Sequence, residues 1–544
     1  MEWWDDLWLN ESFATWMAYK IVASWKPEWR IWLDFDQGKA AALALDALRS
    51  THPIHAEVRN PEDMGEAFDL ITYEKGGAVL RMIEAWLGEE RFRAGIRLYM
   101  RRFARGNAVA GDLWKALEEA SSEPVLALAN AWIRQPGFPV VHLARDGARV
   151  RLAQRRFLSE PGARAEGSWP VPIVLRFEDD RGPREQRLLL REAEAVVELD
   201  AVGPVRWVLG NASSTGFYRV DHAASDRDAL ARHLPGLRPE ERIGLLADEW
   251  ALLRAGEREA GPFLDLLAAF AGEEDRAVLD ELVGRLAAVE HRLLDPTARD
   301  RFRSFAAGLL RPALDRAGLD AAPDEDGEGR LRRAALVRGV AVVARDPALS
   351  AELVRRLDRF LSGDRSALEP NLHDAAVAVA ARDGDEARFA GFRRLAREEK
   401  DPALLRRYRM GVALFEAPDL ARQASEIPFG DEVPLQDRAT FAATLLGNRA
   451  SSGPFWALLR ERWEPFQARL SDAPLMLRRV VEGLGAFTTR SGLEEARAFF
   501  ASHDVPAARQ GISQTLERLT QDVGLWERIG PAVGSWLASR AGDR

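Results

Sequence analysis

The sequence predicts a multidomain, mainly α-helical protein in which a small antiparallel β-sandwich lies between two helical regions. The chain has 544 residues, and at roughly 100–200 residues per domain this length favours about three domains. Apolar residues recur at helical spacing up to about residue 140 and again after about residue 222. Between these points apolar and polar residues alternate, as in half-buried strands. We therefore expect domains at residues 1–139, 140–221 and 222–544.

Composition and charge exclude several classes of protein. With 47% hydrophobic and 30% charged residues the chain can bury substantial cores, and without cysteine it forms neither disulfides nor thiolate metal sites. The formal net charge of −9 argues against a nucleic-acid partner, because phosphate binding needs a concentrated basic face. No apolar run is long enough to span a bilayer, and no charged segment followed by an apolar leader opens the chain. We therefore expect a soluble, cytoplasmic protein with no membrane partner.

The most informative stretch is the first one, M-E-W-W-D-D-L-W-L-N-E-S-F-A-T-W-M. It holds four tryptophans, whereas a chain end is normally polar and frayed, so the stretch is typical of the inside of a domain. Phe13, Trp16 and Ile21 recur at helical spacing and predict a core-facing stripe on a helix. Glu11 lies near the start of that helix, where the helix dipole favours a carboxylate. Spacing alone therefore gives Glu11 a purely structural explanation.

A second informative stretch runs from Phe68 to Met82 and reads F-D-L-I-T-Y-E-K-G-G-A-V-L-R-M. Its apolar residues predict an amphipathic helix that ends at Gly88, since glycine supplies a C-terminal stop. Taken alone, Tyr73 would be a tyrosine with a buried ring and a hydrated hydroxyl.

Two histidines three residues apart, His52 and His55, lie in the segment T-H-P-I-H and could suggest a metal pair. Pro53 disfavours a helix at this point, so the two rings are not expected to share one face. We therefore interpret the segment as a structural loop.

The period of the apolar pattern changes near residue 140. Pro136-Gly137 breaks the preceding helix, and Val140-Val141 opens a strand. Alternating apolar residues mark further strands at residues 150–152, 171–177, 188–190 and 196–197. This pattern predicts a small antiparallel β-sandwich that ends near T-G-F-Y-R-V at residues 215–220.

After residue 222 nearly every segment is predicted to be helical. Pro239 begins one helix and Gly256 follows its end. The buried face of this helix is marked by Ile243, Leu246, Trp250 and Leu253. Comparable helices recur to the end of the chain, separated by short Pro/Gly turns, and they predict an α-solenoid-like superhelix of paired helices.

Several of these segments resemble the zinc aminopeptidases of the aminopeptidase N type, which are gluzincin metallopeptidases. The similar motifs are W-L-N-E at residues 8–11, T-H-P-I at 51–54, I-T-Y-E-K-G at 71–76 and T-G-F-Y-R-V at 215–220. The resemblance covers essentially the whole chain and is most specific in the first 140 residues. It implies a partial, thermolysin-like helical catalytic domain, then the β-sandwich, then a large helical C-terminal domain that limits substrate size.

In that family an H-E-x-x-H helix supplies two zinc ligands and the general base, and the glutamate of W-L-N-E supplies the third ligand. The resemblance therefore implies that Glu11 is a zinc ligand and that peptides are the substrates. It also implies that the Tyr73 hydroxyl points at the zinc site, where it stabilises the oxyanion formed when zinc-bound water attacks the scissile carbonyl. Two positions depart from the family pattern: Ser12 replaces a frequent glycine, and Ala18 replaces a glutamate that supports the site in many members.

None of the eight histidines belongs to an H-E-x-x-H motif, and only ten residues precede Glu11. We therefore interpret the chain as the rear part of a zinc aminopeptidase, holding one metal ligand of three. As such a fragment it should retain no zinc and should hardly hydrolyse N-terminal residues from peptides. Two alternatives stay open. One is a non-catalytic helical scaffold or binding module, and the other is one half of a split enzyme whose missing histidines come from a separate chain.

Overall fold

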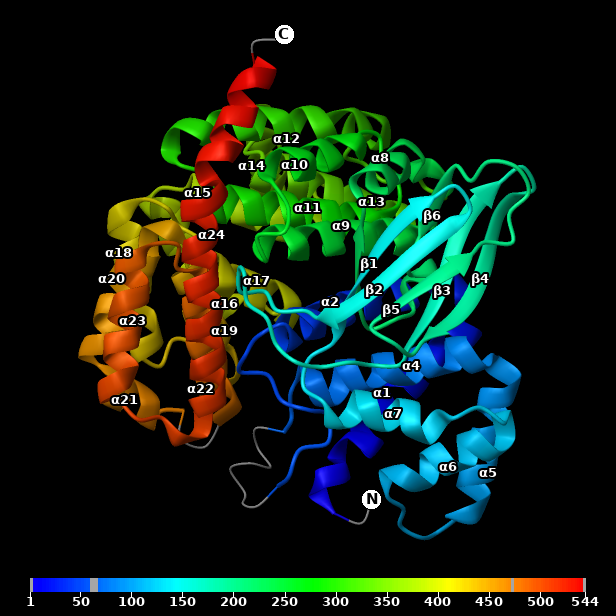
Figure 1. The fold of residues 1–544 in the computed structure, drawn as a ribbon. Helices are drawn as coiled ribbons and strands as arrows, with labels where there is room; N and C mark the ends of the chain where they lie inside the picture. Colours follow the sequence, from blue (N-terminus) through cyan, green and yellow to red (C-terminus); the bar gives the residue numbers. More distant parts are fainter. Residues whose placement is uncertain (1–2, 59–66, 471–473, 542–544) are drawn as a thin grey trace. The chain divides into compact units, whose positions relative to one another are not determined.

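The computed structural model describes residues 3–58, 67–470 and 474–541 (Figure 1). The chain divides into two compact units, residues 1–269 and 270–544. The mainly α prediction is confirmed, because helices form most of both units, and within the described residues all strands belong to the first unit. The domain limits at residues 139 and 221 stay a prediction.

No helix in the described ranges is both long and apolar enough to cross a membrane.

The first unit begins with helices packed around a tryptophan-rich core. These helices are α1 (Leu7–Trp25), α2 (Trp32–Asp46), α4 (Gly76–Leu87), α5 (Glu89–Arg102), α6 (Ala110–Ser121) and α7 (Val125–Arg134). A five-residue π-helical segment, Ile71–Lys75, runs directly into α4, and we call it the Tyr73 turn. Gly88 ends α4 as predicted, with a φ of 85° that favours glycine. The buried tryptophans of this core include Trp8, Trp114 and Trp132.

Two sheets follow in the first unit. The strands are β1 (Pro139–Asp146), β2 (Arg149–Arg156), β3 (Val171–Asp179), β4 (Gly182–Leu190), β5 (Glu194–Glu198), β6 (Trp207–Leu209) and β7 (Arg219–His222). One sheet has the order β5-β2-β1-β7 and the other β4-β3-β6. In the first sheet, β1 and β2 are antiparallel with Leu143 opposite Leu152, and both residues are buried. The pairing is antiparallel as predicted except between β1 and β7, which are parallel.

Three further helices complete the first unit: α8 (Ala224–Arg232), α9 (Pro239–Arg254) and α10 (Ala260–Ala269). α9 begins at the predicted proline, and all four residues predicted to form its inner face are buried. Gly256 follows the helix with a φ of 76°, which places it in the left-handed region that ends many helices.

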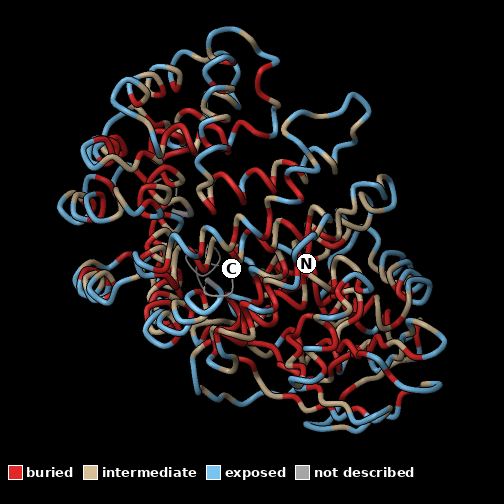
Figure 2. The backbone as a smooth tube through the Cα atoms, turned by 90° about the horizontal axis from the view of Figure 1, so that it is seen from above, coloured by how far each residue is buried: buried red, intermediate tan, exposed pale blue. Residues whose placement is uncertain are grey.

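The second unit is helical throughout its described part. Its helices are α11 (Arg276–Arg292), α12 (Pro296–Ala317), α13 (Gly327–Val337), α14 (Pro347–Leu361), α15 (His373–Arg382), α16 (Glu386–Glu398), α17 (Pro402–Val412), α18 (Pro418–Glu426), α19 (Leu435–Gly447), α20 (Arg449–Glu461), α21 (Trp463–Ala468), α22 (Pro474–Gly483), α23 (Arg490–Ser502) and α24 (Arg509–Ala541). Buried and exposed residues alternate along these helices at short intervals, as expected for amphipathic helices packed on one side. Figure 2 shows the same alternation of buried and exposed residues along the backbone of the molecule.

Asp-Pro pairs start three of these helices. In α12, α14 and α17 the proline is the first helical residue, where its missing N–H costs nothing. The preceding aspartate caps each helix: Asp295, Asp346 and Asp401 accept backbone hydrogen bonds of 2.7–2.8 Å. Local sequence therefore fixes where these helices begin.

Candidate functional site

Glu11 is half-buried on α1. Tryptophans hold this helix in the core. The Trp8 ring stacks on Trp114 with the ring centroids 5.6 Å apart, and Trp16 Nε1 donates a hydrogen bond to Glu84 Oε2 at 3.0 Å. The tryptophan-rich start of the chain therefore packs the helix that presents Glu11.

The Tyr73 turn is a π-helical insertion at the start of α4, and such insertions are frequent at functional sites. Asp69 caps the turn, because its Oδ1 accepts hydrogen bonds from the first two backbone N–H groups of the turn at 2.9 and 3.1 Å. Ser12 Oγ on α1 donates a hydrogen bond to the carbonyl oxygen of Thr72 at 2.6 Å. This bond joins the residue after Glu11 to the residue before Tyr73.

Two glycines let α4 approach α1 closely. A Cβ atom at Gly76 would lie 1.9 Å from Ser12 Oγ and 2.7 Å from Ser12 Cβ, so any side chain there would push the helices apart. At Gly77 a Cβ atom would lie 3.3 Å from Thr15 Cγ2. Gly76 is therefore a packing requirement that sets the separation between α1 and the Tyr73 turn, whereas a side chain at Gly77 would need only a small shift of Thr15.

Tyr73 and Glu11 interact, although they are far apart in the sequence. The pKa of Tyr73 is raised to about 12, first by burial and then by a hydrogen bond to the Glu11 carboxylate and by the charge of that carboxylate. At neutral pH the phenol therefore keeps its proton and is an O–H donor. The structure brings the two predicted site residues together, while their roles as metal ligand and oxyanion donor stay predictions.

The described residues do not by themselves fit a complete zinc site. Catalytic zinc is held by three protein ligands as a rule. Among residues 3–58, 67–470 and 474–541, no group of three or more His, Asp or Glu side chains could hold a metal ion. Glu11 alone would therefore supply at most one of the ligands that a catalytic zinc ion needs.

The two histidines of the T-H-P-I-H loop bind different carboxylates. His52 Nε2 lies 2.8 Å from Asp69 Oδ2, and His55 Nδ1 lies 3.1 Å from Asp6 Oδ1. The other Asp6 oxygen accepts a hydrogen bond from the backbone N–H of Ala110 at 3.0 Å, which ties the start of α1 to the start of α6. Both rings therefore take part in contacts that hold the fold together, as expected for a structural loop.

A buried ion pair anchors the far end of the Tyr73 turn, and sequence reasoning missed it. Lys75 Nζ lies 2.8 Å from Asp46 Oδ2, and both side chains are fully buried. Lys75 also donates a hydrogen bond to the carbonyl oxygen of Gly137 at 3.1 Å. Asp46 Oδ1 accepts hydrogen bonds from Thr51 Oγ1 at 2.6 Å and from the backbone N–H of Gly137 at 2.9 Å. The motif lysine is therefore a structural cation. The sequence gives little signal for this, since a single lysine is normally exposed.

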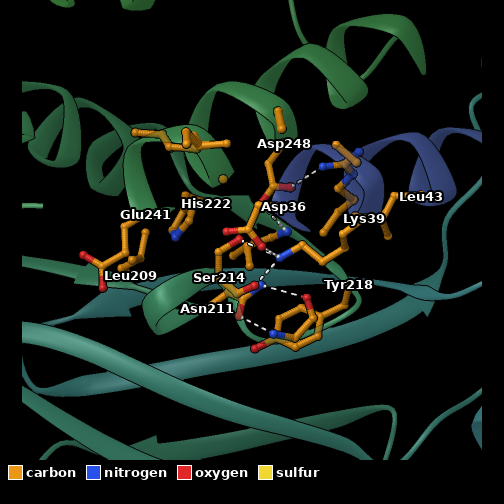
Figure 3. Close-up of a pocket in the computed structure, with 18 residues that line it drawn as sticks. Asp36, Lys39, Leu43, Leu209, Asn211, Ser214, Tyr218, His222, Glu241 and Asp248 are labelled. Carbon is orange, nitrogen blue, oxygen red and sulfur yellow. Dashed lines mark hydrogen bonds and ion pairs between the residues drawn. The ribbon is translucent and has the colours of Figure 1, made fainter. Parts of the chain in front are cut away.

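A second polar cluster lines a small cavity formed by residues of α2, β7 and α9 (Figure 3). Lys39 Nζ lies 2.9 Å from both Asp36 Oδ1 and Ser214 Oγ, and burial lowers the pKa of Lys39 despite the Asp36 charge. The cavity offers about 30 Å³ to water, which is room for one or two molecules and too little for a peptide. The cluster therefore joins helices and sheet. The sequence offered one signal for it, the i, i+3 spacing of Asp36 and Lys39.

Asp248 in this cluster should make stability depend on pH. Burial raises its pKa to about 6, although Arg219 Nη1 at 3.1 Å and the backbone N–H of Val220 at 3.0 Å oppose the shift. A raised folded-state pKa gives stability that is present below the unfolded value of 3.8 and lost as the pH rises through about 6. Between acid and neutral pH, ionisation of Asp248 should therefore lower the free energy of unfolding by up to about 3 kcal/mol.

We expect urea unfolding at several pH values to show this loss in the wild type and not in Asp248→Asn, which has no carboxyl proton to release. The unfolding free energy of the wild type minus that of Asp248→Asn should therefore fall as the pH rises from 4.5 to 7.5. Parallel curves for the two proteins would contradict the assignment.

Comparison with known proteins gives matches along most of the chain. The peptidase family M1 domain matches residues 1–132, and the ERAP1-like C-terminal domain matches residues 207–521. Aminopeptidase M1-A of Oryza sativa subsp. japonica is 31% identical over 533 residues, which cover 95% of this chain and 60% of the relative. Aminopeptidase 2 of Candida albicans is 29% identical over 551 residues, covering 99% of this chain and 59% of the relative. The alanine/arginine aminopeptidase of Saccharomyces cerevisiae is 28% identical over 555 residues, covering 100% and 64%. The chain thus spans about three fifths of the length of these relatives.

Proposed function

Because this chain belongs to the M1 aminopeptidases of the aminopeptidase N type, with an ERAP1-like C-terminal domain, we propose that it supplies part of a zinc aminopeptidase site. In this proposal Glu11 is one metal ligand, and the Tyr73 hydroxyl stabilises the oxyanion. The enzyme removes N-terminal residues from peptides. The relatives described above are all aminopeptidases by name, which supports the reaction class.

The interaction between Tyr73 and Glu11 carries this proposal. A metal ligand and an oxyanion donor must lie beside one reacting group, because a bound zinc ion would polarise the substrate carbonyl and the donor would stabilise the charge on the same oxygen. The hydrogen bond between Tyr73 and the Glu11 carboxylate supports this closeness, and the raised pKa of Tyr73, about 12, means that the phenol keeps its proton at neutral pH. The π-helical turn and the two glycines support the pair by fixing α1 against α4.

We further propose that the 544-residue chain alone is inactive and holds no zinc tightly. None of its eight histidines lies in H-E-x-x-H, so it offers neither the two histidine ligands nor the general base. Absence of the general base alone costs about two to four orders of magnitude in rate. The domain division at residues 139 and 221 and the cytoplasmic location are proposed on sequence grounds only.

The test of inactivity measures bound zinc by atomic emission and hydrolysis of an aminoacyl arylamide by the purified chain. We expect metal far below one ion per chain and no turnover above background. Stoichiometric zinc with rapid hydrolysis would refute the proposal.

A complementation experiment separates the alternatives. The chain is co-expressed with a polypeptide that carries H-E-x-x-H, encoded by DNA upstream of the Met1 codon or elsewhere in the same genome. Zinc and activity that appear only in the mixture, and disappear in Glu11→Gln, would show that Glu11 completes a shared site. A mixture that gains neither zinc nor activity would favour a non-catalytic scaffold.

A further inference from the structure

The His52 ring lies between two hydrogen-bond acceptors. Its Nδ1 is 2.8 Å from the carbonyl oxygen of Pro53, and its Nε2 is 2.8 Å from Asp69 Oδ2. A carbonyl oxygen and a carboxylate oxygen only accept, so both contacts are hydrogen bonds only when both ring nitrogens carry a proton. The geometry therefore favours the imidazolium form of His52.

Asp69 connects this ring to the Tyr73 turn. One carboxylate oxygen binds His52, and the other accepts hydrogen bonds from the backbone N–H groups of Ile71 and Thr72 at 2.9 and 3.1 Å. The Asp69 side chain is only 1% exposed, so water cannot replace a lost partner. The hydrogen bonds thus run without a break from His52 to the residue that precedes Tyr73.

We propose that His52 is a positioning residue: as an imidazolium it fixes Asp69, and through Asp69 it holds the turn that directs the Tyr73 hydroxyl toward Glu11. The importance of this orientation for catalysis rests on the function proposed above. The orientation itself can be measured on the chain without metal or substrate.

The charges around His52 favour the protonated ring. Burial lowers the pKa of His52, but the hydrogen bond and charge of Asp69, the Pro53 carbonyl and the charge of Asp46 outweigh it, so the pKa is raised. Asp46 lies on α2, and its carboxylate forms an ion pair with Lys75 of the Tyr73 turn. The stability gained from the pair of His52 and Asp69 is therefore fully present below the ordinary pKa of histidine. It is lost as the pH rises through the raised pKa of His52.

The neighbouring His55 provides a matched control. It also binds a carboxylate, that of Asp6 at 3.1 Å, and it lies in the same loop. The other oxygen of Asp6 binds the backbone of α6 and not the Tyr73 turn. An effect specific to His52 can therefore be distinguished from general loosening of the loop.

The test uses fluorine NMR of the chain labelled with 3-fluorotyrosine. The sequence has five tyrosines, so five signals are expected, and Tyr73→Phe identifies the signal of Tyr73. His52→Gln keeps a donor for Asp69 but removes the charge. We expect it to shift or broaden the Tyr73 signal and to leave those of Tyr218 and Tyr408 in place. His55→Gln should leave the Tyr73 signal unchanged.

A charge-conserving variant tests the role of the cation. His52→Lys restores a positive group beside Asp69 and should return the Tyr73 signal close to its wild-type position. An unchanged Tyr73 signal in His52→Gln, an equal change in His55→Gln, or no recovery in His52→Lys would overturn the proposal. If His52→Gln yields no folded protein, His52→Lys alone decides. A Tyr73 signal close to its wild-type position would then support the proposal, and a displaced signal would overturn it.

Catalysis is measured separately in the complemented, zinc-loaded assembly. There His52→Gln should lower kcat by about ten- to a hundredfold with KM and zinc content nearly unchanged, because misplacing a catalytic group by about 1 Å costs up to that much. A displaced Tyr73 signal without loss of kcat would support the positioning role of His52 and contradict the proposed role of Tyr73. The two proposals can therefore fail independently.

Discussion

Replacing Tyr73 with phenylalanine is expected to lower kcat of the complemented, zinc-loaded enzyme by about a hundred- to a thousandfold. Removal of one oxyanion donor costs about that much in hydrolases, because the donor binds the oxygen only as it becomes charged. KM should change little, since the ground-state substrate gains little from the phenol. Steady-state hydrolysis of an aminoacyl arylamide measures both constants.

Tyr99→Phe is the control for the loss of a tyrosine hydroxyl. Tyr99 lies on α5, and its ring contacts that of Phe103 with the centroids 5.5 Å apart. We expect this variant to keep wild-type kcat. A Tyr73→Phe enzyme with full kcat and a raised KM would mean that the phenol binds substrate in the ground state instead.

Replacing Lys75 with alanine is expected to lower the free energy of unfolding of the first unit by about 3–5 kcal/mol. The change leaves the Asp46 carboxylate buried without its cation, 2.8 Å from where Lys75 Nζ was, and leaves the carbonyl oxygen of Gly137 without its donor. Urea unfolding followed by tryptophan fluorescence is suitable, because all but four of the 17 tryptophans lie before residue 270.

Arg93→Ala is the matched control for this ion pair. Arg93 pairs with Glu90 at 2.6 Å, but the two side chains are 49% and 79% exposed, so the loss should stay below about 1 kcal/mol. Equal effects of the two substitutions would show that the buried pair is no more important than a surface pair. Such a result would also remove the lysine anchor from the explanation of the Tyr73 turn.

Much of the fold follows from local sequence. Asp-Pro pairs start α12, α14 and α17, Gly88 ends α4, and apolar alternation marks β3, because each of these signals acts within a few residues of the structure it specifies. The π-helical form of the Tyr73 turn and the parallel pairing of β1 with β7 were not predicted. Both depend on partners elsewhere in the chain.

The candidate site was predicted only in part, and for a related reason. Glu11 and Tyr73 were identified by motif resemblance, since no spacing rule connects residues so far apart. The polar contacts that hold the site were missed because they join distant segments: Ser12 and Thr72 are 60 positions apart, and Lys39 and Ser214 are 175 apart. His52 and Asp69 are 17 positions apart, and no spacing rule in the sequence connects them.

α1 lies close to the Tyr73 turn because Gly76 and Gly77 have no side chains. In a saturation mutagenesis screen, Gly76 should therefore tolerate change as poorly as Glu11 and Tyr73, although it has no group that reacts or binds, and Gly77 should be less sensitive. Protecting only chemically active side chains would therefore leave out Gly76, a residue on which the packing of the first unit depends.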